Sequence, residues 1–203
     1  MITIVDYGLG NLGSIQNMLK KIGAKSIISN NISEISDAEK IILPGVGSFD
    51  SAMNKINELN LKDILIKKAN IDKIPFLGIC LGMQILTNSS EEGSEKGLGL
   101  INAATLKFNL IDQSLKIPHM GWNTIEDISE NELTLSMNER EQKFYFVHSY
   151  YVKCHNSNNV IGTTKHGQVF HSMIKNNNIY GAQFHPEKSH TFGMNLFKNF
   201  DAI

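Results

Sequence analysis

The stretch PFLGICLGMQ, residues 75–84, puts a cysteine at the junction of a strand and a helix. The apolar run before Cys80 predicts a buried strand, and the run after it is compatible with a helix. Gly78 and Gly82 flank the thiol. They suit a sharp turn that needs unusual backbone angles and close packing of the strand against the helix. This layout is that of a nucleophile elbow with cysteine in place of serine.

Two interpretations of Cys80 follow from this stretch alone. A cysteine at the start of a helix lies near the positive end of the helix dipole, which favours the thiolate. A free cysteine is also commonly a small buried apolar residue with no chemical role. The rest of the chain must decide between these interpretations.

The first half of the chain alternates short apolar runs with helical patterns. We expect strands over 2–5, 24–29, 40–43 and 74–79, and helices over 12–22, 32–38 and 49–68, the last interrupted near Asn60. Alternating strands and helices predict a parallel sheet covered on both faces. Functional loops gather at the carboxyl ends of such strands, so the loops 6–11, 44–49 and 80–84 are expected to converge.

The second half is richer in short strands, several of them expected to be antiparallel. They are predicted over 104–109, 122–126, 143–148, 150–154, 160–164, 169–174 and 179–185. Ser189 is placed to cap a last helix over 191–200. No stretch reads as a flexible linker. The sequence therefore predicts one α/β domain over residues 1–203, with a mixed, largely parallel central sheet, helices on both faces and short antiparallel strands in the second half.

Composition narrows the classes of partner. The 203 residues carry a net charge of −1 without a long basic run, so neither nucleic acid nor an anionic membrane surface is an expected partner. Two cysteines are too few for a disulfide framework and indicate a reducing, cytoplasmic setting. The strand-like start MITIVDYG does not resemble a signal peptide, and no apolar run is long enough to span a bilayer.

A second motif, YGAQFHPEKS at 180–189, supplies a base and a carboxylate. In an extended chain, side chains two residues apart share a face, so His185 and Glu187 are expected to point the same way. An imidazole can take a thiol proton, and a carboxylate can hold the imidazole in the required tautomer. Alone, this spacing more often marks a solvated strand end. Together with Cys80 it favours a Cys-His-Glu catalytic set.

Other histidines are alternative bases. His119 and His148 adjoin strand-like runs, and four more lie in polar or loop-like contexts: His155, His166, His171 and His190. None of the six has a carboxylate two residues away. The chain has no C-x-x-C and no H-E-x-x-H motif, and His185 with Glu187 would make a poor metal site. We expect no metal and no cofactor.

Eight stretches carry a family resemblance across nearly the whole chain. They are DYGLGNLGS (6–14), LPGVGSF (43–49), PFLGICLGMQ (75–84), SSEEG (89–93), GLGLI (97–101), PHMGWN (118–123), FYFVHSYYV (144–152) and QFHPEKS (183–189). The chain resembles the class I glutamine amidotransferases, whose nucleophile and base motifs are G-x-C-x-G and H-P-E. PHMGWN, FVHSYY and DYGLGN narrow the resemblance to glutaminase subunits of imidazole glycerol phosphate synthase. The resemblance implies a flavodoxin-like fold.

The resemblance also implies a reaction. Cys80 would attack the side-chain amide of glutamine, His185 would act as base and then as acid toward ammonia, and Glu187 would orient His185. The thioester would then be hydrolysed to glutamate.

An oxyanion hole is expected beside the nucleophile. The backbone N–H of Leu81 would supply one donor, because it directly follows the nucleophile. Val46 in the loop of Gly45 and Gly47 would supply the second, although this loop could also be a plain turn. Matching positions in the class make Gly45, Gly47, Gln84, Ser149 and Tyr150 expected substrate contacts. Tyr150 could equally be a strand aromatic.

The family docks on a cyclase with a (β/α)₈ barrel, which receives the ammonia in histidine biosynthesis. By resemblance, Asn11, Trp122 and Lys188 would lie at the docking face, although Trp122 could be core and Lys188 merely solvated. At His166, relatives more often carry tyrosine. Two alternatives stay open: a paralogue that feeds ammonia to a sugar amidotransferase in surface-polysaccharide synthesis, and a non-catalytic partner-binding domain on the same fold.

Overall fold

The first half of the chain forms the alternating elements that the sequence predicts. The computed structural model describes residues 1–112, 114–137 and 141–203. Its first elements are β1 (Ile2–Val5), α1 (Leu12–Lys21), β2 (Ser26–Ser29), α2 (Ile32–Ser36), β3 (Lys40–Leu43), α3 (Phe49–Glu58), α4 (Lys62–Asn70), β4 (Phe76–Ile79) and α5 (Leu81–Ile85). The predicted interruption near Asn60 is confirmed, because α3 and α4 are separate and Asn60 takes a φ of 55° between them.

The second half is strand-rich, as predicted. Its elements are β5 (Ser89–Ser90), β6 (Ala103–Lys107), β7 (His119–Ile125), β8 (Gln142–His148), β9 (Tyr150–Cys154), η2 (Ser157–Asn159), β10 (Val160–His166), β11 (Gln168–Asn176), β12 (Ile179–Ala182), η3 (Pro186–Lys188) and α6 (His190–Ala202). The predicted strand over 179–185 is too long. It ends at Ala182, and Pro186 instead opens the short 3₁₀ helix η3.

One mixed sheet organises the described part of the chain. Ten strands take part, in the order β2-β1-β3-β4-β12-β11-β9-β6-β5, with β10 beside β11. The strands from β2 to β12 run parallel, and β12, β11, β9 and β6 pair antiparallel. The predicted mixed sheet is therefore confirmed.

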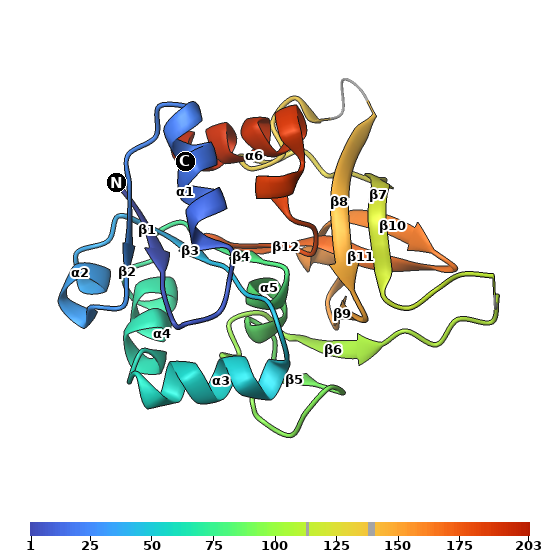
Figure 1. Ribbon diagram of the computed structural model, residues 1–203, viewed down its shortest axis with the longest axis horizontal. Coiled ribbons are helices and arrows are strands. Elements are labelled where there is room, and N and C mark those ends of the chain that lie inside the picture. The colour runs from blue at the N-terminus through green and yellow to red at the C-terminus, as the bar shows by residue number, and fades with distance from the viewer. Residues whose placement is uncertain (113, 138–140) are drawn as a thin grey trace.

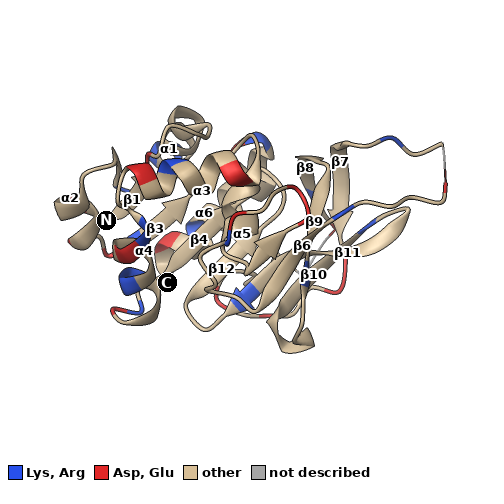
Figure 2. Ribbon diagram, turned by 90° about the horizontal axis from the view of Figure 1, so that it is seen from below, with Lys and Arg blue, Asp and Glu red and all other residues tan. Residues whose placement is uncertain are grey.

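Helices cover both faces of the sheet. Figure 1 shows α1 and α6 on one face and α3, α4 and α5 on the other. Side chains alternate along β1 accordingly: Ile4 belongs to the core cluster that contains Ile15 of α1, whereas Val5 belongs to the cluster that contains Phe49 of α3. Acidic and basic residues are interspersed over the helices and loops (Figure 2). No helix in the described ranges is long and apolar enough to cross a membrane.

A separate pair of strands completes the site end of the molecule. β7 and β8 form a two-stranded antiparallel sheet, with His119 opposite His148 and Trp122 opposite Tyr145. The backbone N–H of His185 donates to the carbonyl of Tyr145 over 2.9 Å, which ties this pair to the chain after β12. The carboxyl ends of β4, β12 and β8 therefore meet.

Candidate active site

Cys80 occupies a strained turn between β4 and α5. Its φ of 56° and ψ of −113° are unusual for a residue with a side chain. Backbone hydrogen bonds hold this conformation: Cys80 N donates to Ala182 O over 2.8 Å, and Met83 N donates to Cys80 O over 3.0 Å. The turn places a largely buried thiol at the carboxyl end of the central strand β4. This position agrees with the predicted nucleophile elbow.

The two flanking glycines serve packing rather than backbone angles. A Cβ at Gly82 would lie 1.8 Å from the carbonyl oxygen of Leu43, and one at Gly78 would lie 2.6 Å from the oxygen of Gly82. Neither glycine has a positive φ; the unusual angle belongs to Cys80 itself. The prediction of close strand-to-helix packing is confirmed, and the assignment of the unusual angles to glycine is wrong.

His185 and Glu187 form a buried pair. Nδ1 of His185 lies 2.8 Å from Oε1 of Glu187, and their side chains are 2% and 1% exposed. The predicted reason for their meeting is wrong, because the chain is not extended through Pro186. The 3₁₀ turn of η3 folds Glu187 back toward the imidazole. With the carboxylate accepting from Nδ1–H, Nε2 is free to accept a proton, and it has no hydrogen-bond partner in the described part of the chain.

A clamp fixes the backbone of His185. The hydroxyl of Ser189 donates to His185 O over 2.6 Å and accepts from Tyr145 N over 3.0 Å. Ser189 does occupy the N-cap of α6, as predicted, but its side chain makes no capping hydrogen bond. The serine instead joins β8, the histidine and the last helix.

The charges around His185 favour its protonated form. Burial lowers its pKa, but the sulfur of Cys80 and the carboxylate of Glu187 outweigh burial and raise the pKa to about 10. A proton transferred from the thiol to the imidazole is therefore well accommodated, since it creates a pair of opposite charges backed by a carboxylate.

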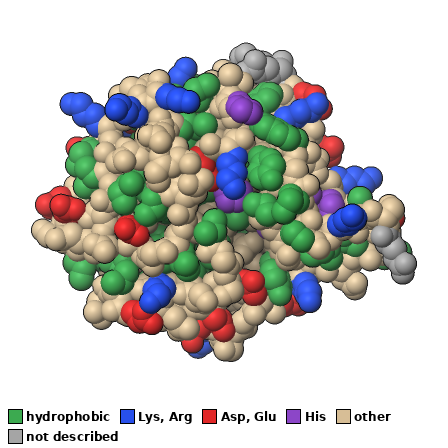
Figure 3. Space-filling model, viewed as in Figure 1, with side chains coloured by type: hydrophobic (Ala, Val, Ile, Leu, Met, Phe, Trp, Pro, Cys, Tyr) green, Lys and Arg blue, Asp and Glu red, His purple; other side chains and the backbone are tan. Residues whose placement is uncertain are grey.

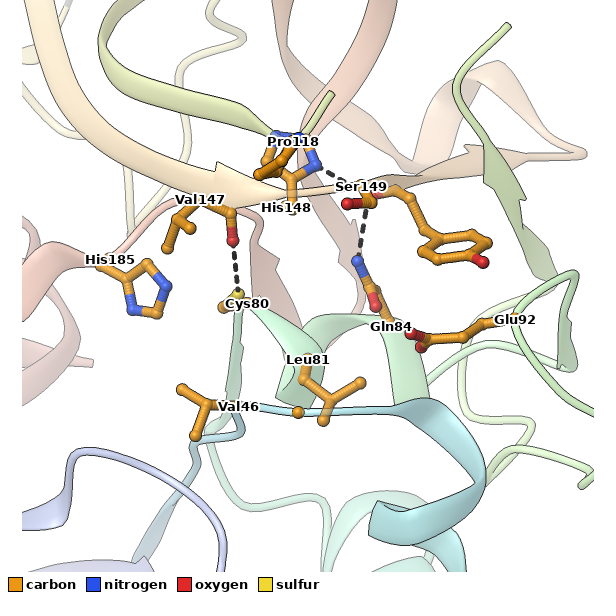
Figure 4. Close-up of a pocket in the computed structure, with 12 residues that line it drawn as sticks. Val46, Cys80, Leu81, Gln84, Glu92, Pro118, Val147, His148, Ser149 and His185 are labelled. Carbon is orange, nitrogen blue, oxygen red and sulfur yellow. Dashed lines mark hydrogen bonds between the residues drawn. The ribbon is translucent and has the colours of Figure 1, made fainter. Parts of the chain in front are cut away.

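A pocket of about 310 Å³ opens over the thiol. It is lined by Val46, Gly47, Cys80, Leu81, Gln84, Glu92, Pro118, Val147, His148, Ser149, Tyr150 and His185. In Figure 4, His185 lies on one side of Cys80 and Gln84 and Glu92 lie on the other. Val46 and Leu81 lie below the thiol, whereas Pro118, His148 and Ser149 lie above it. Two of the predicted catalytic and substrate-binding residues are outside this lining: Gly45 packs against α5, and Glu187 is held behind His185.

The loop of the predicted oxyanion donors packs against the start of α5. A Cβ at Gly45 would lie 2.9 Å from both Gly82 N and Leu81 Cβ, so only glycine allows this approach. Gly47 has a φ of +102°, and Val46 between the two glycines is 41% exposed. The structure thus brings the backbone of residues 45–47 beside Leu81, as the predicted oxyanion hole requires.

Tyr7 holds this loop, although no sequence pattern selects it. Its buried hydroxyl donates to Pro44 O over 2.6 Å. Burial, helped by the charge of Cys80, raises the pKa of the Tyr7 phenol, so the group stays a donor. The signal that could have marked it is its place in the first strand-end loop, which was expected to converge on this edge of the sheet.

Gln84 faces the pocket through a fixed amide. Its Nε2 donates to Tyr150 O and to Gln183 Oε1, both over 3.1 Å. Gln84 is only 4% exposed. These two hydrogen bonds leave its carbonyl oxygen unused, and Gln84 lines the pocket together with Ser149 and Tyr150.

Glu92 is a pocket residue that sequence reasoning left out of the site. Its Oε2 accepts from Phe49 N over 2.8 Å. Asp50 accepts from Ser94 N and Glu95 N, both over 3.0 Å, and so pins the turn that carries Glu92. These backbone hydrogen bonds hold the pKa of Asp50 below its usual range. The SSEEG motif contained the signal, but only the fold shows which acid enters the pocket.

The two alternative bases that adjoin strand-like runs are occupied. His148 lines the pocket, but its Nδ1 lies 2.7 Å from Tyr150 O and its Nε2 lies 3.0 Å from Nδ1 of His119. Nε2 of His119 in turn lies 3.0 Å from Nδ2 of Asn123. Because a carbonyl oxygen only accepts, Nδ1 of His148 donates to Tyr150 O. Nε2 of His148 then accepts from Nδ1 of His119, and Nε2 of His119 accepts from Asn123. Both rings are therefore neutral, and all four ring nitrogens have a partner. In the described ranges, no three His, Cys, Asp or Glu side chains are placed to hold a metal ion.

The residues expected at a docking face lie outside the pocket. Trp122 is 47% exposed, which rules out a core position, and its ring stacks on His190 at 5.5 Å. Nζ of Lys188 lies 5.6 Å from the ring centre of Tyr145. Asn11 is half-buried at the start of α1 and makes no side-chain capping bond. Figure 3 shows one face of the molecule, over which hydrophobic side chains are interspersed with basic, acidic and histidine side chains.

Comparison with known proteins places the chain in a family. The family model for class I glutamine amidotransferases matches residues 3–202. The chain belongs to the class I glutamine amidotransferases. Two curated relatives of this family are named imidazole glycerol phosphate synthase subunit HisH 2. The protein of Methanococcus maripaludis is 57% identical and that of Pseudomonas aeruginosa is 45% identical, each over 98% of both chains. A subunit HisH of Leptospira interrogans is 46% identical over the full length of both.

Solved structures show the same fold at low sequence identity. A structure described as glutamine amidotransferase has a TM-score of 0.75 at 15% identity and covers both chains fully. The PurLQS structure from Thermotoga maritima has a TM-score of 0.71 at 21% identity, covering 98% of this chain and 96% of that one. The predicted class I amidotransferase fold is therefore confirmed.

Proposed function

We propose that this class I glutamine amidotransferase is the glutaminase subunit of an imidazole glycerol phosphate synthase. The observation that carries the proposal is the convergence of Cys80, on a strained elbow, with a buried histidine whose Nδ1 is held by Glu187 and whose Nε2 is free. The relatives named as this subunit match almost the whole chain, which supports the choice within the family.

The reaction proceeds through a thioester. Nε2 of His185 takes the thiol proton of Cys80, and the thiolate attacks the side-chain amide carbon of glutamine. The tetrahedral intermediate collapses when His185 returns the proton to the departing nitrogen, which leaves as ammonia. Water, deprotonated by the same imidazole nitrogen, attacks the thioester, and glutamate leaves as the thiol is reformed. Glu187 holds the imidazole tautomer and stabilises the imidazolium at each step.

The pocket supplies the binding groups. The backbone N–H groups of Leu81 and Val46 donate to the oxyanion, and Gly45 and Gly47 let the loop approach it. The carbonyl oxygen of Gln84 accepts from the substrate, while Ser149 and Tyr150 form the opposite wall. The carboxylate of Glu92 lies across the pocket from His185 and suits the α-amino group of glutamine.

Ammonia is delivered to a partner rather than released. The partner is a cyclase with a (β/α)₈ barrel, and the reaction belongs to histidine biosynthesis in the cytoplasm. Asn11, Trp122 and Lys188 form part of the docking face. An exposed tryptophan supports this role, since tryptophan is enriched among the residues that dominate binding energy.

The Cys80→Ala variant, purified in complex with the cyclase, tests the proposal. Glutamine-dependent synthesis should fall to background because the nucleophile is gone, whereas synthesis from added ammonium salt should continue. Cys154→Ala, which removes the other buried thiol, is the matched control and should keep both activities. Loss of both activities in Cys80→Ala, or survival of the glutamine-dependent one, would contradict the proposal.

A second candidate keeps the chemistry and changes the partner. The number 2 in the names of the Methanococcus and Pseudomonas relatives suits a second copy of the subunit. Such a copy could feed ammonia to a sugar amidotransferase in surface-polysaccharide synthesis. Complementation of a histidine auxotroph lacking this subunit supports the first candidate, and failure to complement with an active glutaminase supports the second. If no glutamine-analogue electrophile labels Cys80, even when the partner is present, the chain is instead a non-catalytic binding domain.

A further inference from the structure

Gln183 joins the thiol of Cys80 to the amide of Gln84. It is fully buried, directly after β12, and its backbone N–H donates to Ser172 O over 2.9 Å. Its Oε1 accepts from Gln84 Nε2 over 3.1 Å, and its Nε2 lies 3.9 Å from the sulfur of Cys80. Neither the base motif nor the pocket lining had singled out this side chain.

The orientation of both amides follows from one carbonyl. Tyr150 O can only accept, and it accepts from His148 Nδ1 and from Gln84 Nε2. The nitrogen of Gln84 must therefore face Tyr150 and Gln183, so the oxygen of Gln183 must face Gln84. This leaves the amide nitrogen of Gln183, a donor, as the atom aimed at the sulfur.

Besides His185, whose pKa the sulfur helps to raise, two polar groups contact the sulfur with opposite preferences. Val147 O, at 3.9 Å, is an acceptor and favours the thiol, since only S–H can donate to it. The Gln183 N–H is a donor and favours the thiolate, which accepts more strongly than a thiol. Helix α5 spans only Leu81–Ile85, so its dipole is small and neighbouring donors matter more.

We infer that Gln183 is a catalytic residue that stabilises the thiolate of Cys80 directly through its amide N–H, in an orientation imposed by Gln84 and the carbonyl of Tyr150. The inference rests on the proposed function in one respect, the role of Cys80 as nucleophile. Gln84 thereby links substrate binding to the nucleophile. Its amide offers the oxygen to glutamine, and its amide nitrogen holds the oxygen of Gln183, which leaves the Gln183 N–H facing the sulfur of Cys80.

The rate of alkylation of Cys80 by iodoacetamide, measured against pH without glutamine, tests this inference. The full chain is digested after quenching, and the Cys80 peptide is quantified by mass spectrometry. In Gln183→Met, which keeps the length but removes the donor, the midpoint of the profile should move about one pH unit upward. Gln183→Glu keeps the shape and faces the sulfur with a carboxylate, so its midpoint should move further.

Two further variants sharpen the result. Gln84→Met frees the Gln183 amide to turn, and a smaller upward shift is expected although residue 84 does not contact the sulfur. Thr164→Val removes a buried hydrogen bond to Ser172 Oγ and should lower the unfolding temperature without moving the midpoint. If Gln183→Met does not fold, Gln183→Glu decides.

An unchanged midpoint in the Gln183 variants, or an equal shift in Thr164→Val, would overturn the inference. Because no glutamine is present, its failure is separate from that of the proposed function. If the Gln183 variants shift the midpoint but the wild-type chain has no glutaminase activity, the role of Gln183 is supported and the proposed function is not. If the wild type is an active glutaminase but the Gln183 variants do not shift the midpoint, only the proposed function is supported.

Discussion

At the scale of single residues, the loop of residues 45–47, which we propose to carry an oxyanion donor, is held by one hydroxyl. Tyr7 O–H reaches Pro44 O from another strand end, and Gly45 leaves just enough room for it, since a Cβ there would lie 2.4 Å from that hydroxyl. The hydrogen bond fixes the loop that carries Val46 against the start of α5. Correct placement of such donors accounts for a large part of catalysis in acyl transfer.

Tyr7→Phe should therefore impair the chemical step. We expect kcat for glutamine to fall about 10-fold with little change in KM, because a loosened donor acts on the transition state rather than on the bound substrate. Steady-state kinetics of the complex measures this. Tyr180→Phe is the matched control: its hydroxyl, also largely buried, donates to Glu132 over 3.3 Å, and its loss should leave kcat unchanged. Equal effects of the two substitutions would contradict the role of Tyr7.

The sequence predicts those site residues that form a recognisable motif with their neighbours in the chain. Cys80 between glycines and the H-x-E spacing of His185 and Glu187 each form a readable pattern. Tyr7, Gln183 and Glu92 could not be selected in this way, because their roles come from contacts with residues 37 to 103 positions away. A buried tyrosine or glutamine has no sequence pattern that names its partner.

At the scale of elements, the elbow requires α5 to touch the end of β3. The backbone of Gly82 lies against Leu43 O so closely that no side chain fits between them. This contact sets the distance between Cys80 and the loop proposed to carry the oxyanion donor, which leaves β3 at Pro44.

Gly82→Ala should displace α5 and abolish activity. The overpacked contact should cost about 1–3 kcal/mol of unfolding free energy, measured by urea denaturation, and glutaminase activity should be lost even where the protein is folded. Gly13→Ala is the control, since a Cβ there meets nothing within 4 Å and helix α1 gains stability by up to about 1 kcal/mol. Full activity in Gly82→Ala would show that the close contact is dispensable.

Element boundaries show where periodicity failed. The run 179–185 was predicted as one strand, but β12 ends at Ala182 and Phe184 packs against Phe144 of β8, with ring centres 3.9 Å apart. The tertiary contact overrode the local pattern, and the histidine that follows was turned toward the thiol. The two-residue strand β5 was too short to produce any pattern.

At the scale of the molecule, two neutral histidines couple the β7–β8 pair to the pocket wall and tie its stability to pH. Burial, chiefly, lowers the pKa of His148 to about 3 and that of His119 to about 4. The unfolded chain takes up protons near the ordinary histidine pKa of 6.5, whereas the folded chain stays neutral at these sites. The unfolded state therefore binds more protons below this pH, and stability falls as pH falls.

His148→Gln should flatten this dependence. Between about pH 6.5 and about pH 4.5 the unfolding free energy of the wild type should fall by about 2–3 kcal/mol more than that of the variant, at up to about 1.4 kcal/mol per pH unit. Urea denaturation at several pH values gives the comparison. His155 lies on the surface, so the unfolding free energy of His155→Gln should depend on pH in the same way as that of the wild type. Parallel curves for His148→Gln as well would contradict a neutral buried histidine.

The fold as a whole was the most predictable level. Alternating runs from Ile2 to Ile79 required a parallel sheet covered by helices, and three strand-end loops then had to meet at one edge. The antiparallel order of β11, β9 and β6 was not predictable, because short strands with similar patterns can pair in several orders. The register that puts His119 opposite His148 likewise depends on the whole assembly.

The most direct test of the central claim is the covalent intermediate on Cys80. The chain, in complex with its partner, is mixed with glutamine, quenched in acid within milliseconds and digested, and the Cys80 peptide is examined by mass spectrometry. We expect a glutamyl thioester on Cys80 that is absent from the Cys80→Ala variant treated in the same way. Glutamine hydrolysis without any adduct on Cys80, or with the adduct on another residue, would contradict the account.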